Sequence, residues 1–270
     1  MDANEIRSLG YVDFMALLNE INRPPGGKDS LRVLVQNTFL TRDSQVLDVG
    51  CNTGYCTFEI AELIKCRVIG VDLNRSMIAA SRMYLRKLYP HLLDRVSFSL
   101  GDGTSLDFPD NHFDLVMSGG STAFIHDIPQ AISEYARVTK PWGFVGDINF
   151  YYRTAPPTIL VKKLNDLMGT YIESWDKSYW HSQYRKTGLE LYSEHHAAMK
   201  PVSKAKIQVY CQALAEQKEW DLSVRNEITQ RLFEIMELFN ENHRYLAYGV
   251  FVLRKRSFPE LTLFTGTRPL

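Results

Sequence analysis

The stretch "VLDVGCNTGYC", residues 46–56, decides the fold. An apolar run with a single acid, Asp48, leads directly into Gly50 and Gly54, with Asn52 between them. An apolar strand that turns through glycines into the helix-type sequence "YCTFEIAELIK" is typical of a strand–turn–helix unit. Glycine lets the backbone approach a ligand without a Cβ in the way. The stretch therefore predicts a ligand-binding turn at the carboxyl end of a strand.

Strand-type and helix-type segments alternate outward from this turn. The strand-type segments are "QVLDVG", "RVIGVDL", "VSFSLGD", "FDLVMSG", "WGFVGDINFYY", the short "WDLSV" and a last "YLAYGVFVLRKR", which should close the sheet. Helix-type segments follow most of them, and one should begin near Asn74. Short apolar strands alternating with helices predict an α/β fold. We expect a doubly wound, mostly parallel seven-stranded sheet with helices on both faces.

The composition excludes several classes of protein. The chain has 270 residues, 45% of them hydrophobic, which suits one large globular domain or one domain with an elaboration. Lys and Arg together number 31, as do Asp and Glu, so the basic excess of a typical nucleic-acid-binding domain is missing. The four cysteines form no C-x-x-C pair, and we expect reduced thiols. With no signal peptide and no apolar run of about 18 residues, we expect a cytoplasmic protein.

The spacing of the glycines discriminates between ligands. A Walker loop needs Lys after its last glycine, but Tyr55 follows Gly54, and the second and third glycines of a dinucleotide fingerprint are also missing. A ligand with nucleoside parts and no phosphate remains. Asp72 ends the second strand, where a carboxylate can accept both ribose hydroxyls. After the third strand, Asp102 or the amide of Gly103 can meet an adenine edge.

Each of these positions also has a plainer structural explanation. Asp72 could only cap the following helix, Asp102 could be a turn residue in "GDGTS", and Gly54 could only allow close packing of a helix on a strand.

Four stretches together resemble the class I S-adenosylmethionine-dependent methyltransferases of the small-molecule type. They are "VLDVGCNTG", "VIGVDLNRSMIAASR", "VSFSLGDGTSLDFPDNHFDLV" and "EYARVTKPWGFV", in the order and spacing of that family. The resemblance is close over residues 43–150 and loose over 226–256. It implies S-adenosylmethionine as the cofactor and methyl transfer to nitrogen or oxygen of a small molecule. Rival hypotheses are a protein or RNA methyltransferase, a nicotinamide-dinucleotide oxidoreductase, and a binder without turnover.

The same resemblance implies a set of cofactor-binding residues. Asn52 stands where the family commonly has glycine, but Asn tolerates a left-handed backbone better than other side chains. Trp142 also replaces a common glycine, with little consequence. The implied residues are Asp48, Gly50, Asn52 and Gly54 in the loop, Asp72 on the ribose, Asp102 and Gly103 on the adenine edge, Leu73 and Met77 beside the adenine ring, and Ser118 and Gly119 below the methionine portion.

The acceptor should lie over "MSGGSTAFIHD", after the fourth strand. This segment lacks the Asn/Asp-Pro-Pro-Tyr motif of adenine-N6 and glutamine methyltransferases, which favours a small-molecule acceptor. A base is needed only if the acceptor must lose a proton; His126 is the first candidate, with His181, His195 and His196 behind it. Asp147 and Asn149 share a strand face but lack a third ligand, so no metal is predicted. Residues that could wall an acceptor pocket, or fill their own core instead, are Tyr151, Tyr152, Trp175, Trp180, His181 and Tyr184.

The N-terminal segment should close over the cofactor. Residues 4–21 predict a helix, "NRPPGG" breaks it, and Asp29 or Ser30 should cap the next helix. Tyr11 could cover the cofactor and Arg23 could pair with its carboxylate, unless "NRPPGG" is only a turn. We expect no membrane partner and consider a homodimer. The expected layout is 1–42 as a helical lid, 43–152 as the cofactor-binding core, 153–205 as a helical, aromatic acceptor cap over the ligand edge, 206–256 as the remainder of the core, and 257–270 as a tail.

Overall fold

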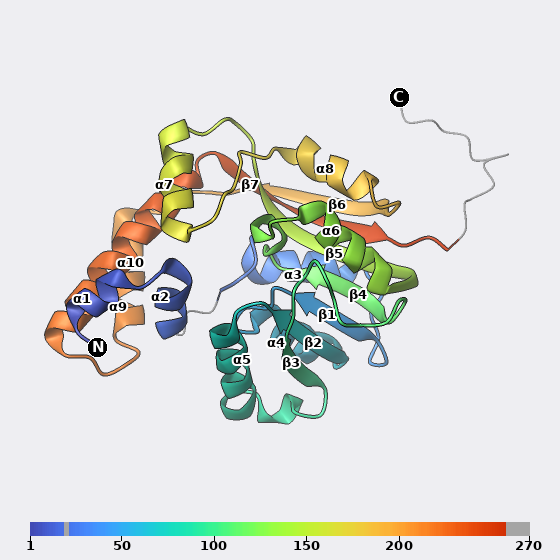
Figure 1. The fold of residues 1–270 in the computed structure, drawn as a ribbon, viewed down its shortest axis with the longest axis horizontal. Coiled ribbons are helices and arrows are strands. Elements are labelled where there is room, and N and C mark those ends of the chain that lie inside the picture. The colour runs from blue at the N-terminus through green and yellow to red at the C-terminus, as the bar shows by residue number, and fades with distance from the viewer. Residues whose placement is uncertain (19–21, 258–270) are drawn as a thin grey trace.

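The computed structural model describes residues 1–18 and 22–257; residues 19–21 and nearly all of the expected tail lie outside this description. A central seven-stranded sheet has the order β3-β2-β1-β4-β5-β7-β6 (Figure 1). Strands β1 to β5 run parallel, and β7 runs antiparallel to both of its neighbours. The predicted mostly parallel α/β sheet is confirmed. The strands are β1 (Gln45–Val49), β2 (Arg67–Asp72), β3 (Val96–Leu100), β4 (Phe113–Ser118), β5 (Thr139–Tyr152), β6 (Glu190–Ala198) and β7 (Leu246–Arg254).

Helices cover both faces of the sheet. Apolar side chains of α3, α4 and α5 pack on one face, and those of α6 and α8 pack on the other. Strands buried on both faces must be apolar on both sides, which explains their near-continuous Val, Ile and Leu runs. The helices are α1 (Ala3–Ser8), α2 (Tyr11–Leu17), α3 (Gly27–Gln36), α4 (Tyr55–Ile64), α5 (Arg75–Lys87), α6 (Ile128–Val138), α7 (Thr158–Met168), α8 (Lys177–Arg185), α9 (Lys204–Ala215) and α10 (Leu222–Asn242).

The strand order fixes where a ligand can bind. The chain moves outward from β1 through β2 to β3, and then crosses back to place β4 on the other side of β1. At such a switch point the loops after the two central strands diverge and leave a crevice at the carboxyl edge of the sheet. The loop of residues 50–54 after β1 and the segment after β4 border this crevice.

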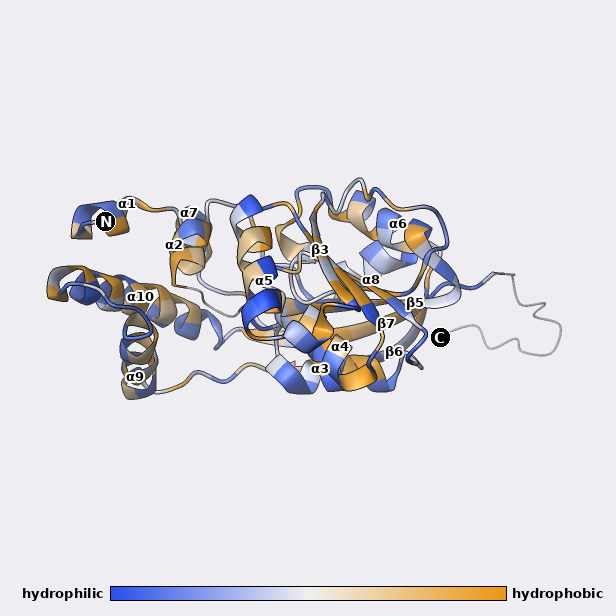
Figure 2. Ribbon diagram, turned by 90° about the horizontal axis from the view of Figure 1, so that it is seen from below, coloured by the Kyte–Doolittle hydropathy of each residue, from blue (hydrophilic) through white to orange (hydrophobic). Residues whose placement is uncertain are grey.

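A second apolar core lies away from the sheet. We call α1, α2, α9 and α10 the helical cluster, because their buried side chains pack together (Figures 1 and 2). Phe14 is fully buried there, with the Arg231 guanidinium 4.3 Å from its ring centre. Residues 206–256 were expected to complete the core, but of this segment only β7 enters the sheet; α9 and α10 belong to the helical cluster.

The sixth strand differs from the prediction. "WDLSV" is not a strand, because Asp221 is the N-cap of α10 and the helix follows directly. The sixth strand is instead β6, from the segment expected to be a helical insertion. It pairs with β7, so β7 is an interior strand and β6 forms the edge.

The N-terminal helices also begin and end differently. As far as residue 18, where the description breaks off, the helix predicted over residues 4–21 is two helices. The first ends at Ser8 with Leu9 as its C-cap, and Gly10 is the N-cap of α2. The next helix is not capped by Asp29 or Ser30: it starts at Gly27, after Gly26 in a left-handed conformation with φ +78°. A Cβ on Gly26 would lie 2.4 Å from the Tyr248 ring, so this start is fixed by packing on β7.

Residues 153–205, which were expected to form one cap over the ligand edge, lie in three separate parts of the structure. Helix α7 packs near α2 and α10, α8 lies beside α6 on a face of the sheet, and β6 forms the sheet edge (Figure 1). Among residues 1–18 and 22–257, no helix is both long and apolar enough to span a bilayer.

Candidate cofactor and acceptor site

The turn after β1 has three residues with left-handed backbone: Gly50 (φ +70°), Asn52 (φ +53°) and Gly54 (φ +95°). A Cβ on Gly50 would lie 2.2 Å from the Cβ of Ser121, so only glycine fits there. A Cβ on Gly54 would lie 2.8 Å from the Phe98 ring, so the predicted packing role of Gly54 is also present. The expectation that Asn52 adopts the left-handed conformation is confirmed.

Asp72 ties the end of β2 to this turn. Its Oδ2 accepts the backbone N–H of Asn52 at 2.8 Å, and its Oδ1 accepts that of Asn74 at 2.9 Å. Asn74, not Asp72, caps α5, since its side chain accepts from the N–H groups of Ser76 and Met77. Burial raises the pKa of Asp72, and the two backbone hydrogen bonds oppose this. The carboxylate therefore lies at the ligand edge of the sheet, beside the turn.

Asp48 lies beneath the turn and is almost completely buried. Its Oδ2 accepts the hydroxyl of Thr57, in the first turn of α4, at 2.7 Å. Its Oδ1 has no hydrogen-bond partner within the described residues. Burial raises the pKa of Asp48 to about 7, although the Thr57 hydrogen bond lowers it. A buried carboxylate oxygen without a donor favours a cationic or hydrogen-bond-donating ligand group and disfavours a phosphate.

The turn after β4 closes against the first turn. The hydroxyl oxygen of the buried Ser118 accepts the backbone N–H groups of Ser121 and Thr122, both at 3.2 Å. The Ser121 hydroxyl then donates to the carbonyl of Gly50 at 2.7 Å. Gly119 has no room for a side chain, because a Cβ would lie 2.7 Å from the sulfur of Cys56. Ser118 and Gly119 thus lie next to the loop with which they were grouped.

The loop after β3 contributes Asp102 and Gly103. Asp102 Oδ1 accepts the backbone N–H and the hydroxyl of Thr104, at 2.9 and 2.8 Å, so the predicted turn role is present. These bonds lower the pKa of Asp102, and the charge of His126 adds to the effect. Gly103 lies beside the end of β1, since a Cβ there would be 3.1 Å from Val49. His126 is exposed and lies close enough to Asp102 for their charges to interact, on the side where the adenine is expected.

Four further predicted positions, Leu73, Met77, Arg23 and Tyr11, differ in their surroundings. Met77 is buried at the start of α5, whereas Leu73 is 70% exposed. The Arg23 guanidinium lies 5.6 Å from the ring centre of Tyr55, the first residue of α4. Tyr11 packs edge-on against Phe239 of the helical cluster, so the structure does not bring it to the first turn.

The aromatic residues of the expected acceptor cap mostly fill a core. Trp180 and Tyr184 are buried between α8 and the sheet, and the Trp180 indole donates to the carbonyl of Phe150 at 3.0 Å. Trp175 stacks on Tyr179 with ring centres 4.8 Å apart. This matches the plainer alternative, in which these side chains stabilise their own segment.

The remaining acceptor candidates have partners outside the turns. The Tyr152 hydroxyl donates to Asn242 at 3.1 Å, and Tyr151 lies edge-on to His196. Glu194 lies 2.7 Å from His181 and 3.1 Å from His196, at the sheet edge. His195 is exposed on the same strand. In the part of the chain that the structure describes, no three His, Cys, Asp or Glu side chains are grouped so as to hold a metal ion.

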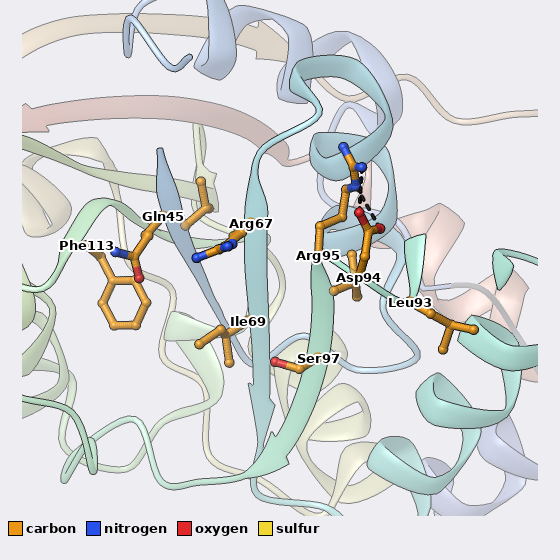
Figure 3. Close-up of a pocket in the computed structure, with 10 residues that line it drawn as sticks. Gln45, Arg67, Ile69, Leu93, Asp94, Arg95, Ser97 and Phe113 are labelled. Atoms are coloured by element: carbon orange, nitrogen blue, oxygen red, sulfur yellow. Dashed lines mark hydrogen bonds and ion pairs between the residues drawn. The ribbon is translucent and has the colours of Figure 1, made fainter. Parts of the chain in front are cut away.

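Two pockets lie elsewhere. One of about 220 Å³ lies at the amino ends of the parallel strands, where Gln45, Arg67 and Phe113 line it and Arg95 pairs with Asp94 (Figure 3). Another of about 450 Å³ lies between α9 and α10. The first is at the edge of the sheet opposite the glycine turn, and neither contains a predicted site residue.

Comparison with known sequences finds one matching domain family and partial matches to two relatives. Residues 46–143 match a family described as "Methyltransferase domain". A sterol 24-C-methyltransferase of Eremothecium gossypii is 38% identical over 110 residues, which are 41% of this chain and 29% of that protein. Phosphoethanolamine N-methyltransferase 1 of Arabidopsis thaliana is 28% identical over 145 residues, covering 54% of this chain and 29% of that protein. The chain thus matches less than a third of the length of either relative.

Two solved structures share the fold over most of the chain. The crystal structure of MccD protein has a TM-score of 0.75 at 22% identity and covers 87% of this chain and all of that one. Phosphoethanolamine N-methyltransferase 2 of Haemonchus contortus, solved in complex with S-adenosyl-L-methionine, has a TM-score of 0.70 at 18% identity and covers 94% of this chain and 60% of that one. At these identities the similarity shows the fold.

Proposed function

We propose that this chain, whose residues 46–143 match a methyltransferase domain, is a class I S-adenosylmethionine-dependent methyltransferase that transfers the methyl group of that cofactor to nitrogen or oxygen of a small molecule. The relatives match only part of this chain, so the activity of the whole protein belongs to the proposal. It is carried by one observation: beneath the glycine turn, Asp48 Oδ1 has no hydrogen-bond partner among residues 1–18 and 22–257.

The residues present fit this cofactor. It has an ammonium group, a carboxylate, a ribose diol and an adenine, but no phosphate. The free Oδ1 of Asp48 suits a hydrogen-bond-donating ammonium, and Asp72 stands where a ribose diol would be accepted. A pyrophosphate would instead meet a buried carboxylate, which argues against a nicotinamide dinucleotide. Arg23, held near the start of α4, is our candidate partner for the carboxylate of the cofactor.

The work of the protein in this reaction is positioning. The bound cofactor supplies a methyl group already activated by its sulfonium, which an acceptor lone pair displaces in line. Asp72 and the two glycine turns hold one reactant against the sheet edge, and such fixation can lower the barrier by several kcal/mol. His126 stays our candidate base for an acceptor that must lose a proton, although it lies on the Asp102 side.

A small-molecule acceptor is supported by charge and by the names of the relatives. The formal net charge is zero, unlike that of a typical RNA-binding domain. The relatives are named for sterol and phosphoethanolamine, and others for demethylmenaquinone. We take the protein to be cytoplasmic, because its four cysteines are free and buried.

Calorimetric titration tests the cofactor assignment. We expect the wild-type protein to bind S-adenosylhomocysteine and not NADH. Asp72→Asn should weaken binding at least tenfold. Asp114→Asn is the matched control, since Asp114 pairs with Lys140 at the opposite edge of the sheet and its loss should leave affinity unchanged. Binding of NADH in preference would refute the proposal.

Transfer of radiolabelled methyl groups tests the acceptor class. Panels of small amines, phenols and hydroxylated lipids should contain a substrate, whereas peptides and RNA should stay unlabelled. Label found only in peptide or RNA would keep the cofactor assignment and overturn the small-molecule one.

A further inference from the structure

Asp147 is a fully buried carboxylate on β5 that no step above uses. It pairs in register with Ser118 of the neighbouring strand, at the carboxyl edge of the sheet. Each of its oxygens accepts a hydroxyl from a different element. Thr122, in the turn after β4, donates to Oδ1 at 2.9 Å, and Tyr184 of α8 donates to Oδ2 at 2.9 Å. Asp147 therefore joins three segments that are distant in the sequence.

Further hydrogen bonds within residues 118–122 link Thr122, and so Asp147, to the glycine turn after β1. The backbone N–H of Thr122 donates to the Ser118 hydroxyl, which also accepts from Ser121. Ser121 in turn donates to the carbonyl of Gly50, at the start of the glycine turn. A continuous series of hydrogen bonds thus runs from α8, through Asp147 and the turn after β4, to the loop expected to hold the cofactor.

We propose that Asp147 is a positioning residue for cofactor binding, which holds the 118–122 turn against Gly50 through Thr122 and makes the position of that turn depend on α8 through Tyr184. The inference rests on the proposed function, because it assigns the role to the same cofactor site.

The cost of this carboxylate argues for more than a packing role. Burial raises the pKa of Asp147 to about 6, and the hydrogen bonds from Thr122, Tyr184 and Asn149 oppose the shift. Asp147 takes part in none of the ion pairs among residues 1–18 and 22–257. Burying a carboxylate is costly, and the hydrogen bonds from the two hydroxyls offset part of that cost. Its geometric effect is to fix two hydroxyls, one on each side, at defined positions.

Thr122→Val tests the holding role, because it removes the hydroxyl and keeps the shape. Thr139→Val is the matched control. Thr139 is as completely buried as Thr122, but it lies at the far end of β5 from Asp147, where its hydroxyl donates to the backbone carbonyl of Tyr135. Both variants should lose similar thermal stability. In calorimetric titration with S-adenosylhomocysteine, only Thr122→Val should bind at least tenfold more weakly, and Thr122→Ser, which keeps the hydroxyl, should restore affinity.

Tyr184→Phe tests the coupling to α8 from a residue outside both turns. It removes the hydroxyl that donates to Asp147 Oδ2 and accepts from the Asn149 amide. We expect a three- to tenfold loss of affinity for S-adenosylhomocysteine. If wild type binds and the Thr122→Val and Thr139→Val proteins bind equally well, the holding role is wrong; unchanged affinity in Tyr184→Phe removes the coupling. If wild type itself does not bind, the proposed function fails instead. Should Thr122→Val not fold, Thr122→Ala removes the same hydroxyl with less crowding.

Discussion

Asp48 lies at the candidate cofactor site, and its burial there is costly for the stability of the folded protein. A carboxylate this deeply buried is stabilised in the folded protein by the Thr57 hydroxyl, while its other oxygen lacks a partner among the described residues. Groups with pKa values shifted in this way concentrate at functional sites, where stability is exchanged for binding. The residue should therefore reduce the stability of the ligand-free protein and contribute to its affinity.

Asp48→Asn should separate these two effects. Burial raises the folded-state pKa of Asp48 to about 7, whereas the unfolded pKa is ~3.9. The protonated form costs the folded protein less than the ionised form, so the stability of the wild type is highest below the unfolded pKa and falls as the pH rises through about 7. The Asn variant lacks this loss. Relative to wild type, its free energy of unfolding should rise by roughly 2 to 3 kcal/mol between pH 5 and pH 8, measured by urea denaturation.

The same variant should bind S-adenosylhomocysteine at least tenfold more weakly. A stability difference from wild type that is equal at both pH values would show that Asp48 does not titrate in this range in the folded protein.

Among individual elements, the sequence predicted those with strong local patterns. Strands β1 to β5 and helices α4 to α6 follow the alternation of apolar segments and turns closely. Strand β6, "ELYSEHHAA", was missed because it is an edge strand with largely exposed side chains, so it lacks an apolar pattern. "WDLSV" was misassigned because a short apolar run does not distinguish a strand from the start of a helix.

In the candidate site, too, some features could be predicted from the sequence and others could not. The left-handed Asn52 and the position of Asp72 at the end of β2 follow from the residues and their neighbours in sequence. The contacts Thr57–Asp48, Ser121–Gly50 and Thr122–Asp147 were missed, because they depend on how separate elements pack. The only available signals were hydroxyl residues close to the two turns.

Helix α8 provides a test at the scale of one element. Trp180 is completely buried where α8 meets the sheet, whereas Trp142 is half exposed beside Arg254. Trp180→Ala should cost about 3 to 5 kcal/mol of unfolding free energy in urea denaturation. Trp142→Ala, as the control, should cost about 1 kcal/mol or less. Equal losses would mean that the aromatic residues of α8 do not form part of the core.

Within residues 1–18 and 22–257, the apolar cores lie in two regions: around the sheet, with one cluster on each face, and in the helical cluster. The helical cluster draws its helices from both ends of the chain, since α1 and α2 pack with α9 and α10. Regions with separate cores often open separately. The sheet and the cluster should therefore differ in their response to a local defect.

Phe14→Ala should reveal that difference. Phe14 is fully buried in the helical cluster, and its loss should cost about 3 to 5 kcal/mol locally. In native-state amide hydrogen exchange, protection should fall in α1, α2, α9 and α10 and stay unchanged in β1 and β4. Leu47→Ala, in the centre of the sheet, is the converse control. A uniform loss of protection in both variants would show that the two cores unfold as one unit.

The place of β7 between β5 and β6 affects how the nascent chain can fold during translation. The ribosome makes the residues of β6 before those of β7, yet in the described part of the chain β7 is the only strand that pairs with β6. The edge of β5 that faces away from β4 also has no partner strand until β7 has been made. Exposed strand edges invite pairing with other chains, and charged or polar side chains reduce that risk. The polar sequence of β6 thus suits a segment that must remain unpaired until β7 has been made.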